Sequence, residues 1–457
     1  METVVKKNDL VLITIDDIGA DGEGIGKYKG YTLFVKDTVV GDKVLVNVMK
    51  TMKTYGYARL VELIEPSVFR VEPRCPIAAK CGGCQLQQLD YSKQLEYKEN
   101  KVRNCLTRIG GFQDFTMEPI YGMDEPYYYR NKSQFPVGRN KDGSIAIGFY
   151  AGRTHSIIDT EHCYIGAEVN IEILKFLREF IEKYRIEPYE EETNQGLLRH
   201  ILTRVGFRTG EVMVCLVING KDLPHKEELI LGLQNIQGMK SICLNINKDK
   251  TNVILGEKVI PIWGEPYITD YIGSIRYRIS PLSFFQVNPE QTKKLYDIAL
   301  DYADLHGNEV VWDLYCGIGT ISLFLAQKAK QVYGVEVIPE AIEDAKTNAR
   351  INGIGNAEFF VGAAEEVLPS KYKEKKLPAD VIVVDPPRKG CEQSLLDTIL
   401  LMAPERVVYV SCDPATLARD LKYLCDKDYK LVKVRAVDQF GHSVHVETVV
   451  LLERKGC

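Results

Sequence analysis

The amino-acid sequence predicts an α/β protein that ends in a Rossmann-like, doubly wound and mostly parallel sheet. From residue 281 onward, apolar strands alternate regularly with amphipathic helices, which is the pattern of such a sheet. Residues 8–64 instead alternate apolar and polar side chains in short runs between glycine turns, which is typical of a small antiparallel β-barrel. Residues 65–280 mix strand-like and helical stretches and therefore indicate an α+β middle region.

Length and composition agree with a globular protein of two or three domains. The chain has 457 residues, of which 45% are hydrophobic and 26% are charged, and this is too long for one ordinary hydrophobic core. No run of about 18 apolar residues occurs, and residues 1–19 lack the pattern of a signal peptide. Twelve cysteines without an export signal indicate thiols and ligands rather than disulfides. We expect a cytoplasmic monomer without membrane contact.

The first part of the chain, residues 1–64, contains four strand-like runs: LVLITI, YTLFVK, DKVLVNVMK and YGYARLVELI. This segment resembles a TRAM domain, an OB-like barrel that binds RNA. Pro66 and Pro73 bracket a linker after it. We place the central α+β domain at residues 65–280 and the C-terminal domain at residues 281–457.

A basic and aromatic segment in the central region suggests contact with RNA. Between Tyr127 and Arg153 there are five basic residues against one acidic residue, interleaved with six aromatic residues. Basic side chains can hold phosphates while aromatic faces stack on unpaired bases. The alternative is the basic face of an amphipathic sheet, because a net charge of −5 does not by itself indicate a nucleic-acid binder.

The C-terminal part carries the pattern of an adenosine site. The segment DLYCGIGT, from Asp313, follows an apolar strand, and its two glycines let the backbone approach a ligand closely. About 20 residues later the next strand ends in Glu336, whose carboxylate can accept both ribose hydroxyls. Neither a dinucleotide fingerprint nor a Walker loop is present, so S-adenosylmethionine fits better than NAD or ATP. Asp385, in DPPR, places a further carboxylate in the same crevice, and the arginine after the prolines argues against an exocyclic amine as target.

A cysteine at a strand end is the candidate nucleophile. Cys412 follows the apolar run VVYVS and precedes a helix that begins near Pro414. Because the N–H groups of a helix N-terminus favour a thiolate, we expect the pKa of this thiol to fall below about 8.5. A thiolate that adds to C6 of uracil makes C5 nucleophilic enough to attack a methylsulfonium carbon. The alternative is a small buried cysteine that only packs.

The same chemistry requires a general base. After methylation, C5 must lose a proton before the thiol can be eliminated. Glu447, in GHSVHVET at the start of the last apolar strand, is the candidate for this role. The alternative is that Glu447 is an edge-strand carboxylate and that His442 and His445 are polar turn residues.

Together these motifs resemble the RumA/TrmA-type RNA (uracil-5-)-methyltransferases, above all the 23S rRNA branch that carries a TRAM domain and an iron–sulfur cluster. The resemblance covers nearly the whole chain and implies formation of 5-methyluridine in 23S rRNA. It implies that Cys412 of SCDP is the nucleophile and that Glu447 of HVE is the base. It also implies four contacts with S-adenosylmethionine: Gln286, Tyr315, Glu336 and Asp385.

The resemblance further implies a [4Fe–4S] cluster held by four cysteines: Cys75, Cys81, Cys84 and Cys163. The local spacing C-x5-C-x2-C is compatible with a cuboidal cluster, while a zinc site is the alternative that spacing leaves open. Methyl transfer needs no electron, so we expect the cluster to have a structural or RNA-positioning role.

Three other functions remain open at this point. The same chemistry can act on tRNA, because some related enzymes with both barrel and cluster modify tRNA. Radical methylthiotransferases also carry this barrel, but they need C-x3-C-x2-C, and this chain has five residues in the first gap. A non-catalytic RNA-binding or folding factor would be unaffected by Cys412→Ala.

Overall fold

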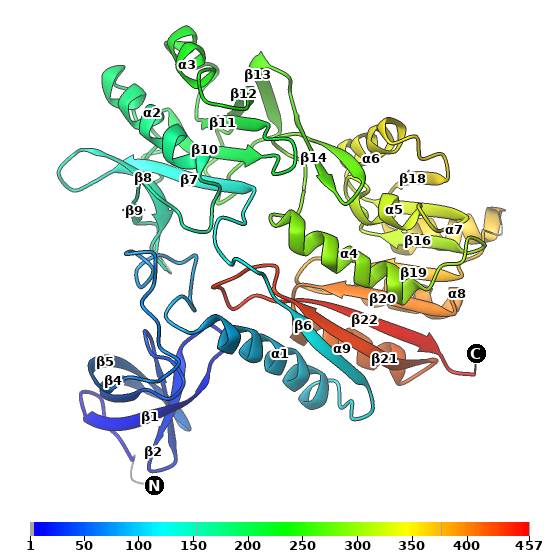
Figure 1. The fold of residues 1–457 in the computed structure, drawn as a ribbon, viewed down its shortest axis with the longest axis horizontal. Coiled ribbons are helices and arrows are strands. Elements are labelled where there is room, and N and C mark those ends of the chain that lie inside the picture. Colours follow the sequence, from blue (N-terminus) through cyan, green and yellow to red (C-terminus); the bar gives the residue numbers. More distant parts are fainter. Residues whose placement is uncertain (1–3, 153, 376, 457) are drawn as a thin grey trace. The chain divides into compact units, whose positions relative to one another are not determined.

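The computed structural model describes residues 4–152, 154–375 and 377–456 (Figure 1). The chain forms two compact units. The first contains Met1–Asn100, Phe149–Ile158 and Phe440–His445, and the second contains Lys101–Gly148, Asp159–Gln439 and Val446–Cys457. Each unit therefore combines segments that are distant in sequence. The predicted domain boundaries at residues 64 and 280 are not tested by this grouping and stay a prediction.

A closed β-barrel in the first unit confirms the barrel predicted for the N-terminal part, but one strand pair, Tyr31–Val35 with Tyr55–Glu65, is parallel and not antiparallel as expected. Its strands follow the order β1-β2-β3-β5-β4. Alternate side chains of the first strand, Val11, Ile13 and Ile15, are buried in the barrel core, as a strand with one solvated face requires. The strands are β1 (Leu10–Ile18), β2 (Gly24–Tyr28), β3 (Tyr31–Val35), β4 (Lys43–Thr51) and β5 (Tyr55–Glu65).

The middle of the chain forms a mixed sheet with the order β13-β12-β11-β10-β7-β8-β9, which confirms the α+β character. Its strands are β7 (Lys132–Arg139), β8 (Ile145–Tyr150), β9 (Ile157–Asp159), β10 (Leu198–Val205), β11 (Val212–Ile218), β12 (Met239–Ile246) and β13 (Lys258–Gly264). The other elements of this region are α1 (Tyr91–Arg108), α2 (Val169–Lys183), α3 (Lys226–Leu233), β14 (Ile268–Ile272) and β15 (Ile275–Ile279). Strands β14 and β15 pair as a separate hairpin.

The C-terminal sheet has the order β18-β17-β16-β19-β20-β22-β21-β6 and confirms the doubly wound α/β prediction (Figure 1). Its strands are β6 (Thr116–Tyr121), β16 (Val310–Leu314), β17 (Gln331–Glu336), β18 (Ala357–Val361), β19 (Val381–Val384), β20 (Arg406–Ser411), β21 (Tyr429–Val437) and β22 (Glu447–Arg454). Its helices are α4 (Pro289–Ala303), α5 (Thr320–Leu325), α6 (Pro339–Ile351), α7 (Ala364–Lys375), α8 (Gln393–Met402) and α9 (Pro414–Cys425). The edge strand β6 comes from a segment far upstream in the chain.

Helices cover both faces of this sheet. Along β16, Val311 packs in one apolar cluster with residues of α4, α5 and α6. The next side chain, Trp312, packs in another with residues of α8 and α9. Burial on both faces explains why the central strands β16, β19 and β20 are almost continuously apolar in sequence. Among the described residues, no helix is long and apolar enough to span a bilayer.

Candidate active site

The carboxyl ends of four parallel strands lie at one edge of the C-terminal sheet. Strand β16 pairs in parallel with β17 and β19, and β19 pairs in parallel with β20. Strand β22 runs antiparallel to β20 and places Thr448 opposite Ser411, so that β22 begins where β20 ends. This arrangement brings five of the predicted site residues to the same edge: Tyr315, Glu336, Asp385, Cys412 and Glu447.

The glycine loop after β16 is held to the tip of β17. The backbone N–H groups of Tyr315 and Cys316 both donate to the carbonyl oxygen of Val335, each at 3.0 Å. The Gly317 N–H donates to Glu336 Oε2 at 3.2 Å, and the Ile338 N–H donates to Glu336 Oε1 at 3.1 Å. Two adjoining loops therefore orient the carboxylate that is predicted to bind the ribose.

The surroundings of this carboxylate fit an adenosine ligand. Gly317 has a φ of +54°, and a Cβ built on it would meet no other atom within 4 Å, so the loop faces open space. The apolar side chains of Val337 and Ile338, next to Glu336, are 57% and 53% exposed. Apolar surface beside a hydrogen-bonding carboxylate suits a ligand that joins an aromatic ring to a diol.

A buried carboxyl supports the glycine loop from below, a feature that sequence reasoning did not single out. Asp313 is fully buried, and its Oδ2 accepts a hydrogen bond from the Ser322 hydroxyl at 2.5 Å. Burial raises the pKa of Asp313 to about 7, and the charges of Asp385 and Glu336 act in the same direction. The hydroxyl of Tyr296 donates to Thr320 Oγ1 at 2.9 Å and fixes the helix that follows the loop.

Gln286 lies in the segment that precedes α4. Its backbone oxygen accepts from Asn131 Nδ2 at 3.0 Å, and the Asn131 N–H donates to the oxygen of Val287 at 2.8 Å. Among the described contacts, no hydrogen bond joins the Gln286 side chain to the strand-tip residues. Its contact with a ligand therefore stays a prediction.

The thiol of Cys412 has a raised pKa, which is opposite to the expected direction. Burial raises the pKa of Cys412 to about 12, the charges of Glu447 and Asp385 add to the effect, and Arg388 opposes it. Helix α9 does begin at Pro414 as predicted. However, Asp413 Oδ1 already accepts from the N–H groups of Ala415 and Thr416 at 2.9 and 3.0 Å. The expectation of a lowered pKa was wrong mainly because burial and the charges of Glu447 and Asp385 raise the pKa; in addition, the Asp413 cap occupies two helix N–H groups that were expected to stabilise a thiolate.

Glu447 and Asp385 form an acidic pair around the thiol. Glu447 is 4% exposed, and burial raises its pKa to about 8, with a further rise from Asp385 and an opposing effect of Arg388. Burial also raises the pKa of Asp385 to about 7. Two carboxyls and a thiol that share a site of low dielectric disfavour simultaneous ionisation. The site therefore favours a cationic ligand, which would offset these negative charges.

The loop that carries the first three predicted cluster cysteines supplies donors to the sulfur atoms of two of them, Cys75 and Cys81. The Gly83 N–H donates to Cys81 Sγ at 3.4 Å. Burial raises the pKa of Cys75, and hydrogen bonds from the N–H groups of Ile77 and Ala78 act to lower it. Such N–H donors are typical around thiolate ligands, so the local chemistry fits a cluster.

The four predicted cluster cysteines are divided between the two units. Cys75, Cys81 and Cys84 belong to the first unit, whereas Cys163 belongs to the second. Within residues 4–152, 154–375 and 377–456, no group of three or more His, Cys, Asp or Glu side chains is arranged to hold a metal ion. The cluster therefore stays a prediction.

Tertiary pairing extends the basic and aromatic segment with residues that sequence reasoning missed. Lys132 on β7 lies directly opposite Arg204 on β10. Burial lowers the pKa of Lys132 to about 7, and the charges of Arg204 and Arg130 contribute. Like charges placed opposite each other are unfavourable, and here the lowered pKa of Lys132 and the hydrogen bonds from Arg204 to the oxygens of Pro281 and Ser283 reduce the repulsion. The arginine inside the apolar run LRHILTRV was the available signal.

An aromatic stack lies in the same region of the second unit. The rings of Tyr128 and His162 stack with centroids 5.7 Å apart, and those of His162 and Tyr164 stack at 4.0 Å. Stacked rings beside basic side chains are typical of surfaces that bind unpaired bases.

Comparison with family models gives two matches. Residues 90–455 match the model described as tRNA (uracil-5-)-methyltransferase, and residues 5–61 match the TRAM domain. The two matches together span nearly the whole chain.

Two relatives and one solved structure resemble the chain over nearly its full length. An "uncharacterized RNA methyltransferase" of Clostridium tetani is 53% identical, with 99% of this chain and 98% of that protein aligned. Another of Halalkalibacterium halodurans is 52% identical over the same shares. The crystal structure of Pyrococcus abyssi tRNA (uracil-54, C5)-methyltransferase with S-adenosyl-L-homocysteine is 30% identical, with a TM-score of 0.78. That alignment covers 97% of this chain and 100% of the archaeal chain.

Proposed function

Because the chain belongs to the tRNA (uracil-5-)-methyltransferase family and carries a TRAM domain, we propose that it methylates C5 of a uridine in RNA, using S-adenosylmethionine. The main support is the placement of a thiol and two carboxyls, Cys412, Glu447 and Asp385, at one strand edge beside a loop that fits adenosine. When bound, S-adenosylmethionine supplies the methyl group as a sulfonium.

In the proposed reaction Cys412 and Glu447 act in sequence. The Cys412 thiolate adds to uracil C6, and C5 then takes the methyl group. The Glu447 carboxylate removes the C5 proton, the bond between C6 and sulfur breaks, and the thiolate is restored. Both roles require anions, so Arg388, which lowers the pKa of both groups, assists both steps.

The substrate that we propose is 23S rRNA, with a single-stranded target uridine. The TRAM domain and the cysteine motif support this choice, because the family resemblance links both features to the ribosomal branch. The second candidate is tRNA, which the likeness to the Pyrococcus abyssi tRNA enzyme favours. Methyl transfer to 23S rRNA fragments and to tRNA transcripts, measured side by side, separates the two. The monomeric state and the cytoplasmic location stay predictions.

We also propose that the protein binds a [4Fe–4S] cluster, with these ligands: Cys75, Cys81, Cys84 and Cys163. The N–H donors directed at the sulfur atoms of Cys75 and Cys81 support it. Because the reaction transfers no electron, the cluster would hold the loop in shape or position RNA. Zinc remains the alternative that the spacing allows.

A covalent trap tests the proposed reaction. RNA that contains 5-fluorouridine should form an adduct stable on denaturing gels, because fluorine cannot leave C5 as a proton. The adduct should require S-adenosylmethionine and disappear in Cys412→Ala. Cys425→Ala, at the other end of α9, is the matched control and should leave the adduct unchanged. Methyl transfer at the normal rate in Cys412→Ala would rule out the mechanism, and the absence of any transfer by the wild-type protein would favour a non-catalytic RNA-binding factor.

A further inference from the structure

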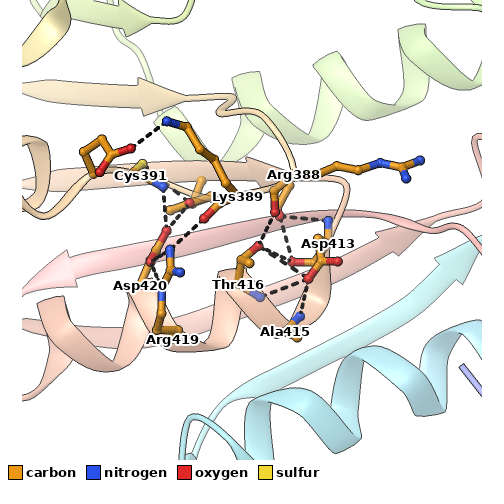
Figure 2. Close-up of polar contacts among 11 residues, drawn as sticks. Arg388, Lys389, Cys391, Asp413, Ala415, Thr416, Arg419 and Asp420 are labelled. Carbon is orange, nitrogen blue, oxygen red and sulfur yellow. Dashed lines mark hydrogen bonds and ion pairs between the residues drawn. The ribbon is translucent and has the colours of Figure 1, made fainter. Parts of the chain in front are cut away.

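Three side chains on one face of α9 contact the loop that follows β19. They are Thr416, Arg419 and Asp420, which we call the α9 clasp. Their spacing of three and four residues places them side by side on a helix. The clasp begins one turn after Cys412, so the same helix follows the proposed nucleophile and contacts the loop (Figure 2).

The clasp holds the loop through three of its backbone groups. Thr416 Oγ1 donates to the oxygen of Arg388 at 3.1 Å, and Arg419 Nη2 donates to the oxygen of Lys389 at 2.9 Å. The Cys391 N–H donates to Asp420 Oδ2 at 2.8 Å. Figure 2 shows the Arg388 side chain extending away from these contacts. The clasp therefore fixes the backbone at Arg388 and leaves its guanidinium available elsewhere.

Asp420 is the centre of the clasp. Its side chain is 1% exposed, and its Oδ2 also accepts from the Tyr409 hydroxyl at 2.7 Å. Arg419 Nε donates to Oδ1 at 2.8 Å. A carboxylate this deeply buried is stable only when both of its oxygens accept hydrogen bonds. Its removal therefore leaves the groups that donate to it without an acceptor.

A glycine allows the loop to approach the clasp. Gly390 has a φ of +79°, and a Cβ at this position would lie 2.5 Å from Asp420 Oδ2 and 2.6 Å from Arg419 Nη2. A side chain would push the loop away from α9. The close contact between this loop and the clasp therefore requires glycine at position 390.

The loop carries two of the charges that face Cys412. Asp385 and Arg388 act on the thiol from this loop, and Glu447 acts on it from β22. Of these three groups only Arg388 lowers the pKa of Cys412, against burial and both carboxyls. A long, exposed arginine side chain can adopt many conformations. Arg388 therefore lowers the pKa of Cys412 effectively only if its backbone is held in place.

We propose that the α9 clasp is a positioning device: it fixes the backbone at Arg388, on the loop after β19, so that the guanidinium faces Cys412 at the end of the neighbouring parallel strand β20. This inference deepens the proposed function and rests on Cys412 as the reacting group. The clasp residues are positioning residues, because their effect on the thiol acts through the loop that carries Arg388.

The test is the pH dependence of Cys412 alkylation by iodoacetamide, followed by mass spectrometry of the peptide that contains Cys412. Asp420→Asn should move the profile to higher pH, and a shift of one unit slows alkylation about tenfold below the pKa. Thr416→Val removes one hydrogen bond and should slow the alkylation of Cys412 about two- to fivefold. Arg388→Ala should shift the alkylation profile at least as far as Asp420→Asn does. The double variant Arg388→Ala/Asp420→Asn should show the same shift as Arg388→Ala alone.

Two controls separate positioning from a general loss of structure. Thr416→Ser keeps the hydroxyl and should restore the wild-type profile. Asp426→Asn, at the exposed end of the same helix where Asp426 pairs with Lys422 at 3.5 Å, should change nothing. If Asp420→Asn does not fold, Thr416→Val still tests the proposal, because it only replaces one hydroxyl group with a methyl group of similar size.

An unchanged profile in folded Asp420→Asn or in Thr416→Val would overturn the proposal, as would shifts that add in the double variant. These readouts do not depend on methyl transfer. Methyl transfer that persists in Cys412→Ala would refute the proposed function, whereas the alkylation profiles test the clasp by themselves.

Discussion

At the scale of single residues, the proposed active site is a set of groups whose ionisation is coupled. Asp385 and Glu447 have pKa values raised to about 7 and about 8, mainly by burial. Around neutral pH these carboxyls share protons, and the charge of one changes the pKa of the other. A bound cation would shift this balance toward the anions, so in the proposed reaction the ligand would favour ionisation of both Glu447 and Cys412.

The raised pKa of Glu447 predicts a stability effect. Between the usual pKa of 4.5 and the folded value of about 8, the folded chain binds more protons, so the free energy of unfolding falls as pH rises. Glu447→Gln should therefore stabilise the protein by about 1–3 kcal/mol at pH 8 and by much less at pH 5. Urea melts at both pH values measure this difference.

Glu453→Gln is the control for this experiment. Glu453 lies on the same strand, but it is partly exposed and pairs with Lys430 at 2.9 Å. We expect no gain in stability at pH 8 from this change. Equal effects of Glu447→Gln at both pH values would contradict the raised pKa.

Glu447→Gln also separates the steps of the reaction. The amide cannot remove the C5 proton, so methylated RNA should remain bound to Cys412. On denaturing gels, ordinary RNA should form a methylated adduct that the wild-type protein releases, with turnover at least about a hundredfold slower. Normal turnover in this variant would remove Glu447 from the mechanism.

At the scale of elements, the direction of the strands determines which residues meet. Parallel strands β16, β17, β19 and β20 bring their carboxyl ends together, as the sequence pattern predicted. Strand β22 is antiparallel to β20, and it contributes Glu447 from its first residue. The clasp on α9 then joins two neighbouring strand-to-helix connections.

The barrel depends on one buried ion pair. Asp42 is fully enclosed and accepts from the Val39 and Ser67 N–H groups and from Arg70 Nε at 2.8, 2.9 and 3.1 Å. Asp42→Ala leaves these donors unsatisfied and should destabilise the barrel by about 3 kcal/mol. Hydrogen exchange of barrel amides in the full chain measures this loss.

The pH dependence of this effect follows from the pKa of Asp42. Burial acts to raise it, but hydrogen bonds from Arg70, Val39 and Ser67 leave it lowered. The stabilisation is therefore present above the usual pKa and is lost as pH falls through the lowered value. Glu65→Ala, which removes the exposed pair between Lys43 and Glu65, should change stability by less than about 1 kcal/mol. A similar loss in both variants would contradict the special role of Asp42.

At the scale of the whole molecule, the local distribution of charge matters more for RNA binding than the net charge does. The chain is acidic overall, with a net charge of −5. The charge of Arg130 nevertheless acts on Lys132, so these two residues form a local positive group, which suits phosphate binding. RNA affinity should therefore depend on this group and on salt.

Arg130→Ala should weaken binding to single-stranded RNA similarly for all sequences. If Arg130 contacts one phosphate, the slope of log affinity against log salt should decrease by about 0.7. Fluorescence anisotropy across a range of salt concentrations measures this slope. Lys226→Ala, where the lysine is paired with Asp222 at 2.8 Å, is the control and should leave the slope unchanged. An unchanged slope in Arg130→Ala would exclude a phosphate contact.

The proposed cluster predicts a measurable metal content. Protein purified without oxygen should contain about four iron and four sulfide per chain, with the broad visible absorption of such clusters. Cys81→Ser should lower both contents together, whereas Cys425→Ala should not. Zinc in place of iron, without sulfide, would assign the site to zinc.

The sequence by itself determined the fold class, the barrel and the strand ends that carry Glu336, Asp385 and Cys412, because hydrophobic period and turn residues are local properties. The tertiary structure alone decided the raised pKa of Cys412, the pairing of Lys132 with Arg204 and the contact of Asp420 with the loop after β19. Burial and charge depend on neighbours that are distant in sequence, so no local pattern contains them.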